Sequence, residues 1–177
     1  MDDRRGVADR GNRLTIRLLP GWAEALAVIR PNVVGERRRT VAGTEVRYLL
    51  FRRTPGGPGA WWDADGSVYI PDQDEFIGSD ERRAGLIALH EQTEYRHRAA
   101  GRPHAYAHRR AYLAELLAAR EVLDPLELER YVRERLRPYP SWKVPDPDAL
   151  ADSLLHVLNA AKPRRGELFR RIAEPRI

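Results

Sequence analysis

The chain has 177 residues, a formal charge of +5 and no cysteine. A chain of this length accommodates one ordinary hydrophobic core, so we expect a single domain. The absence of cysteine excludes disulfides, thiolate catalysis and cysteine-ligated zinc, which leaves His, Asp and Glu as the strong metal-binding side chains. Only Lys143 and Lys162 among the 31 basic residues are lysines. Charges of both signs are interleaved along most of the chain, so composition alone does not predict a nucleic-acid site.

The N-terminal residues carry no sign of a targeting segment. The first five residues are polar, and no apolar run approaches the ~18 residues of a membrane span. We therefore expect a cytoplasmic protein with no membrane partner. Residues 1–12 are charged and lack periodicity, which is typical of a disordered tail. Residues 13–177 are expected to fold as a single α+β domain with a small twisted sheet.

Residues 13–78 are expected to consist mainly of strands. In chain order, we predict a strand at 14–19, a short helix at 22–29, a hairpin of 38–41 with 44–51, and a hairpin of 61–62 with 67–70. The turns of the two hairpins are predicted at Ala42-Gly43 and at 63–66. Pro31 is the signal that ends the short helix.

Residues 79–123 are expected to form a helical hairpin. Ser79 is placed to cap its first helix, and Gly101 is a C-terminal stop signal. Pro103 stands where a proline opens a helix, which continues to about Val122. Residues 124–177 are expected to add C-terminal helices, predicted at 124–137, 148–161 and around 168–172.

Most of the histidines lie in the predicted hairpin, at positions His90, His97, His104 and His108. At ~100° per residue, His90 and Glu94 project from one helix face, with Glu91 about a quarter turn away. Leu86 and Ile87 flank this stripe, so the polar side chains are embedded in the apolar face of the helix. Such a placement is typical of buried ligands rather than of a solvated surface.

A second polar stripe is predicted on the next helix. His104, Tyr112 and Glu115 share the helix face of His108 at helical periodicity. Because two helices joined by a short turn pack antiparallel, we expect the two stripes to face one another. Buried carboxylates and imidazoles need partners, and a shared cation supplies them.

The His-Glu-x-x-Glu string alone is weak evidence in a chain rich in Glu, and the matched second stripe strengthens it. We expect His90, Glu94 and His108 to bind a metal ion. His97 and His104 are expected to lie outside the coordination sphere or to face solvent. His156, on a separate amphipathic helix, is expected to serve packing.

These residues resemble the strand and active-site helix of zincin metallopeptidases, in particular compact bacterial and phage-associated relatives. The shared features are a strand, a His-Glu-x-x-Glu-Tyr helix, a Gly-containing turn, an Ala-His-x-x-Ala segment and a downstream Glu. The matching residues here are Ser67–Ile70, His90–Tyr95, Gly101, Ala107–Ala111 and Glu115. The resemblance spans about residues 60 to 120, and it implies hydrolysis of a peptide bond with Zn²⁺ as cofactor.

One departure from ordinary zincins concerns Glu94, which stands where the second His of His-Glu-x-x-His would be. Carboxylate oxygen is an acceptable zinc ligand, but an anionic ligand makes a bound water less acidic. Two imidazoles and one carboxylate are also the ligand set of non-haem Fe²⁺ enzymes, so Fe²⁺ or another divalent metal stays open as an alternative.

The expected roles follow from this resemblance and from the helical spacing. Glu91 is expected to act as general base to the metal-bound water and then as acid to the leaving amine. Glu115 is either a fourth ligand or an acceptor for an imidazole N–H. Tyr95 or Tyr112 is expected to donate to the developing oxyanion.

A peptide or protein substrate is expected to lie along 67–70, where it adds a strand to the sheet edge. The alternative is a non-catalytic binding module, in which the metal only staples the hairpin. In that case the basic residues, with Trp61, Trp62 and Trp142, would contact a nucleic acid or a protein partner. A catalytic zinc keeps an open coordination position, whereas protein ligands close a structural site.

Overall fold

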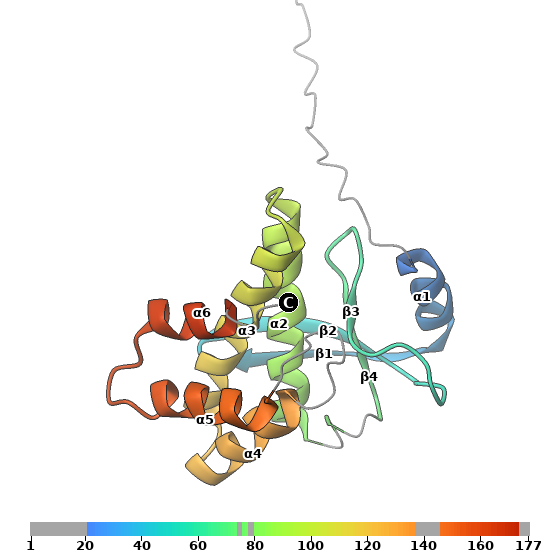
Figure 1. Cartoon of the computed structure of the whole chain (residues 1–177). Helices are drawn as coiled ribbons and strands as arrows, with labels where there is room; N and C mark the ends of the chain where they lie inside the picture. Colours follow the sequence, from blue (N-terminus) through green and yellow to red (C-terminus); the bar gives the residue numbers. More distant parts are fainter. Residues whose placement is uncertain (1–20, 74–75, 78–79, 137–145, 174–177) are drawn as a thin grey trace, which may run out of the picture.

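The computed structural model describes residues 21–73, 76–77, 80–136 and 146–173. Within these residues the chain forms a four-stranded mixed sheet and six α-helices, an α+β architecture (Figure 1). In chain order the elements are α1 (Trp22–Ile29), the 3₁₀ turn η1 (Arg30–Asn32), β1 (Val33–Val41), β2 (Thr44–Phe51), β3 (Trp61–Trp62), β4 (Val68–Pro71), α2 (Glu81–Ala99), α3 (His104–Val122), α4 (Pro125–Leu136), α5 (Pro147–Leu158) and α6 (Arg165–Ala173). The predictions for residues 1–19 and for Trp142 lie outside the described residues.

The first predicted hairpin is confirmed, with β1 starting earlier than expected, at Val33. Strands β1 and β2 pair antiparallel, with Val41 opposite Thr44 across a two-residue turn. Both turn residues have positive φ, 46° at Ala42 and 74° at Gly43, which is the backbone of a tight hairpin turn. Along the first part of β2 the side chains alternate, so that Val46 and Tyr48 are buried while Glu45 and Arg47 are exposed.

The sheet order is β1-β2-β4-β3, with β4 parallel to β2 and antiparallel to β3. The second predicted hairpin is thereby confirmed. The expectation that 67–70 forms a sheet edge is wrong, because β2 pairs with β4 on the side that the hairpin with β3 leaves open. Strand β4 therefore has a partner on each side, and all four of its residues are buried.

Helices α2 and α3 form the predicted antiparallel hairpin at the centre of the molecule (Figure 1). The N-terminal cap of α2 is Asp80, whose carboxylate accepts a hydrogen bond from the Arg82 backbone N–H. The expected cap, Ser79, lies outside the described residues. Gly101 provides the positive φ of the connecting turn, 75°, and Pro103 occupies the cap position just before α3.

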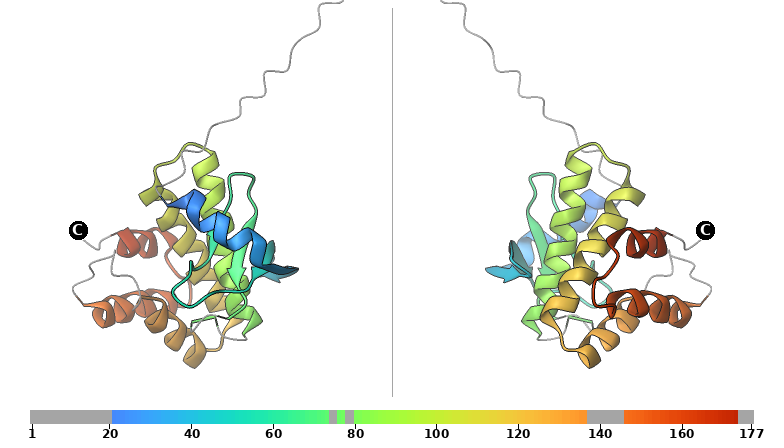
Figure 2. Two further views of the ribbon diagram at one scale, coloured as in Figure 1. Left: turned by 90° about the vertical axis from the view of Figure 1, so that its right-hand side faces the viewer. Right: turned by 90° about the vertical axis from the view of Figure 1, so that its left-hand side faces the viewer.

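The hairpin separates the sheet from the C-terminal helices (Figures 1 and 2). Helix α2 contacts all four strands, while α3 contacts α4, α5 and α6. The interface between α2 and α3 is consequently covered by structure on both sides, and it is there that the two polar stripes meet. None of the described helices combines the length and apolarity that a membrane crossing requires.

Candidate metal centre

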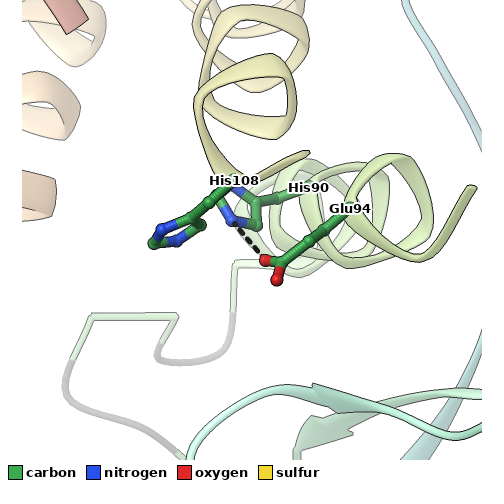
Figure 3. Close-up of side chains that lie close together, drawn as sticks. All are labelled: His90, Glu94 and His108. Carbon is green, nitrogen blue, oxygen red and sulfur yellow. Dashed lines mark ion pairs between the residues drawn. The ribbon is translucent and has the colours of Figure 1, made fainter. Parts of the chain in front are cut away.

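Three side chains converge between the two central helices: His90 and Glu94 from α2, and His108 from α3 (Figure 3). One ligand atom of each lies within 4.8 Å of the others. The two imidazole rings have centroids 5.1 Å apart. The expectation that the two stripes face one another is therefore confirmed. We refer to these three residues as the ligand cluster.

Glu94 is a buried carboxylate whose two oxygens face different partners. Its Oε2 lies 3.8 Å from His90 Nε2, and its Oε1 lies 3.1 Å from His104 Nε2. Burial by itself raises the pKa of Glu94, but the hydrogen bond with His104 and the nearby imidazoles of His108 and His90 outweigh it and keep the pKa below its usual value. Glu94 is thus ionised near neutral pH, which is the form that binds a cation.

His108 provides the imidazole from the second helix. Burial lowers the pKa of His108 to about 3, with a further contribution from the neighbouring His90. The ring is accordingly neutral at physiological pH. A neutral imidazole has a nitrogen lone pair, which is what a metal ligand requires.

Glu115 lies behind His90, on the opposite side of that ring from Glu94. Its Oε2 is 2.6 Å from His90 Nδ1, and a carboxylate only accepts, so Nδ1 carries the proton. In the neutral ring, the lone pair is then on the other nitrogen, Nε2, which lies on the side of Glu94. Of the two expectations for Glu115, its placement matches the acceptor of an imidazole N–H rather than a fourth ligand.

Two residues of α4 hold Glu115 in place. The Tyr131 hydroxyl donates to Oε1 at 2.7 Å, and Arg135 Nε donates to the same oxygen at 2.8 Å. All three side chains are buried. Burial alone would raise the pKa of Glu115, but Arg135 and the His90 hydrogen bond reverse this and bring it to about 2. We refer to Glu115, Tyr131 and Arg135 as the anchor network.

Glu91 follows His90 on α2 and is partly buried. Burial, reinforced by the negative charge of Glu94, raises the pKa of Glu91 to about 8. Among the described residues we find no hydrogen-bond partner for its carboxylate. A carboxyl group whose pKa lies near neutrality is suited to accept and release a proton at working pH.

The two tyrosines expected to assist catalysis lie in different places. Tyr95 points toward the turn between β3 and β4, where its hydroxyl is 3.4 Å from the Ala64 carbonyl and its ring contacts Trp62. Tyr112 is buried against the ligand cluster, with ring centroids 4.6 Å from His90 and 5.0 Å from His108. The geometry therefore favours Tyr112 over Tyr95 as a residue of the site.

The other histidines differ from one another. His104 was expected outside the coordination sphere, and it lies beside the ligand cluster as a partner of Glu94. His97 packs edge-on against Tyr106, with ring centroids 5.6 Å apart. His156, which was expected to serve packing, is exposed.

Sequence reasoning missed Tyr131 and Arg135. A signal was available, because the two residues are four apart on α4 and share its apolar face with Leu128 and Val132. An arginine on the buried face of a helix needs a buried carboxylate, and Glu115 on α3 is that partner.

Two of the tryptophans proposed to contact a partner, Trp61 and Trp62, pack in or against the hydrophobic core. Trp62 is 2% exposed, packs against Trp22 and accepts a hydrogen bond from the Trp22 indole at its backbone carbonyl. Trp61 is half-buried and packs against the Trp22 ring. Trp62 is therefore not available to a partner in the folded chain.

The donor set of the ligand cluster fits a divalent cation. Two imidazoles and one ionised carboxylate are acceptable ligands of zinc and of several other transition metals, and one imidazole is already oriented by a carboxylate. Comparison of the chain with protein-family models, curated proteins and solved structures finds no match.

Proposed function

We propose that the chain is a metal-dependent hydrolase, with Zn²⁺ as the preferred cofactor and His90, Glu94 and His108 as its ligands. The observation that carries this proposal is the orientation of His90. Its Nδ1 is 2.6 Å from the buried Glu115 carboxylate, while its Nε2 faces Glu94. A carboxylate behind a histidine fixes the tautomer and ring orientation that metal ligation needs.

A divalent cation at this position supplies Lewis acidity, which activates water for attack on a carbonyl group. The proposed task of Glu91 is to accept the proton of the attacking water and to deliver it to the leaving group. Its raised pKa, about 8, supports both halves of this role near neutral pH. Tyr112 keeps the two imidazoles in position, because its ring packs against both.

A peptide bond is the proposed substrate, and the likeness of residues 60 to 120 to zincins supports this choice. The edge of the sheet nearest β4 is β3, which is only two residues long. A peptide that extends the sheet on that side would pair with β3 and not with β4. We therefore propose that the peptide pairs with β3, and not with residues 67–70 as expected from the sequence.

The test measures metal content and hydrolysis separately. Protein purified without added metal is analysed for bound metals, and hydrolysis of a mixed peptide library is followed by mass spectrometry. Glu91→Gln should retain the metal while turnover falls at least ~100-fold, the usual effect of losing a general base. Glu121→Gln, an exposed carboxylate on α3, is the matched control and should change neither quantity. Turnover that survives in Glu91→Gln contradicts the proposed base.

The anchor network favours a second candidate, a metal that only staples the helices. The anchor network and its hydrogen bond to His90 join α2, α3 and α4 through buried side chains, as a structural site would. In that case chelation lowers the thermal stability, yet the metal-loaded protein cleaves no peptide and its metal has no exchangeable water.

A further inference from the structure

His104 is the first residue of α3 and stands at the solvent side of the ligand cluster. Its side chain is 42% exposed, while that of Glu94 is 7% exposed. The His104 Nε2 atom lies 3.1 Å from Glu94 Oε1. The nearest polar contact of the otherwise buried Glu94 carboxylate is thus with a residue at the surface.

The position of the His104 ring is set by His108, one turn later on the same helix. The two rings are stacked, with centroids 5.4 Å apart and an interplanar angle of 25°. This stacking directs the edge of the His104 ring toward Glu94 while leaving the outer part of the ring in solvent. His104 is therefore held between Glu94 and His108. It does not belong to the group of three residues, His90, Glu94 and His108, whose ligand atoms lie close to one another.

The two oxygens of Glu94 are consequently distinguishable. Oε1 is engaged by His104, and Oε2 is the oxygen that faces His90 Nε2. A free carboxylate on a flexible glutamate can rotate and offer either oxygen, or both, to a cation. A hydrogen bond to one oxygen removes that freedom and leaves the other for ligation.

We propose that His104 is a positioning residue that holds Glu94 in a one-oxygen ligating orientation, as Glu115 holds His90. This inference rests on the proposed metal site and adds a second oriented ligand to it. The N–H of His104 draws on the negative charge of Glu94, so the carboxylate donates less charge to the cation than an unpaired one does.

The experiment measures zinc affinity by competition with a chromophoric chelator, in wild type and in three variants. His104→Ala removes the hydrogen bond, and the affinity should fall about 10- to 100-fold, the usual effect of losing the partner of a ligand. His104→Gln keeps an N–H donor and should recover most of the affinity. His97→Ala removes a histidine of the same hairpin that packs on Tyr106, and it should leave the affinity unchanged.

X-ray absorption of the zinc-loaded proteins separates positioning from ligation. The number of nitrogen ligands should be the same in wild type and in His104→Ala. Unchanged affinity in His104→Ala overturns the inference, as does a failure of His104→Gln to recover it. Loss of one nitrogen ligand in His104→Ala also overturns it, because His104 would then bind the metal itself. If the wild type binds no zinc, the proposed metal site itself is wrong. That result differs from the outcomes above, in which zinc binds and only the role of His104 fails.

Discussion

Glu94 of the ligand cluster and Glu115 of the anchor network lie on opposite sides of the His90 ring, and the two regions differ in exposure and in bonding. The anchor network is fully buried, and both Glu115 oxygens are engaged by other described side chains. The ligand cluster borders solvent through His104, and its three ligand atoms lie within 4.8 Å of one another. The anchor network therefore fixes geometry by pairing its buried charges, while the ligand cluster keeps ligand atoms available for a cation.

The largest expected effect breaks the anchor network. Arg135→Met leaves the Glu115 carboxylate buried without its cation, and removing one partner of a buried pair costs about 3–5 kcal/mol in unfolding free energy. Denaturant titration measures this cost. Arg133→Met is the matched control, because Arg133 lies on the same helix and pairs only with exposed carboxylates. Equal costs for the two variants would contradict the distinction between the regions.

The second prediction breaks the ligand cluster without disturbing the anchor network. His108→Ala should weaken zinc binding by more than ~100-fold, beyond the usual effect of losing an outer partner. The unfolding free energy of the metal-free protein should fall less than in Arg135→Met, because the His108 ring is only partly buried and is neutral near neutral pH. Chelator competition and denaturant titration test the two parts. Zinc affinity equal to that of wild type would exclude His108 from the site.

The third prediction concerns Glu94, the carboxylate of the ligand cluster. Glu94→Ala should bind zinc much more weakly, whereas Glu94→His should retain it by restoring His-Glu-x-x-His. Removing an anionic donor makes the activated water more acidic, so the alkaline side of the activity profile should move to lower pH in Glu94→His. Metal stoichiometry at neutral pH is the deciding measurement. Unchanged stoichiometry in Glu94→Ala would remove this residue from the coordination sphere.

The fourth prediction concerns the pH dependence of stability in the metal-free protein. The pKa of Glu91 is raised from 4.5 to about 8, so its contribution to stability is complete below pH 4.5 and is lost as the pH rises through 8. The pKa of Glu115 is lowered to about 2, so its contribution is present above pH 4.5 and is lost as the pH falls through 2.

Glu91→Gln should flatten the decline in unfolding free energy between pH 5 and 8 and leave the acid side unchanged. Denaturant titrations across this range, with chelator present, measure both. A wild type whose stability is constant from pH 5 to 8 would show that Glu91 is not held in a surrounding that disfavours its charge.

Much of the fold could be predicted from local signals. Periodicity and turn residues located both hairpins and the helices, because these signals act over a few residues. The position of β4 inside the sheet could not be predicted, since the strand pattern does not specify which neighbours a buried strand receives. The helix cap moved from Ser79 to Asp80, a shift within the usual uncertainty of helix ends.

The candidate site, like the fold, has a part that the sequence predicts and a part that it does not. Helical spacing placed His90, Glu94 and His108 together, because the two helices are adjacent in sequence and pack antiparallel. Arg135 and Tyr131 come from a third helix, and nothing in the spacing says which face of α3 that helix covers. The contact of His104 with Glu94 depends on side-chain orientation at a helix start, which periodicity does not specify.

The central claim is that His90, Glu94 and His108 bind one metal ion while Glu115 orients His90. A crystal structure of zinc-loaded protein, with data collected at the zinc absorption edge, tests it most directly. We expect a single anomalous peak within bonding distance of His90 Nε2, Glu94 Oε2 and a His108 ring nitrogen. The hydrogen bond between His90 Nδ1 and Glu115 should be retained. The absence of a peak between these side chains, or zinc bound directly by Glu115, would contradict it.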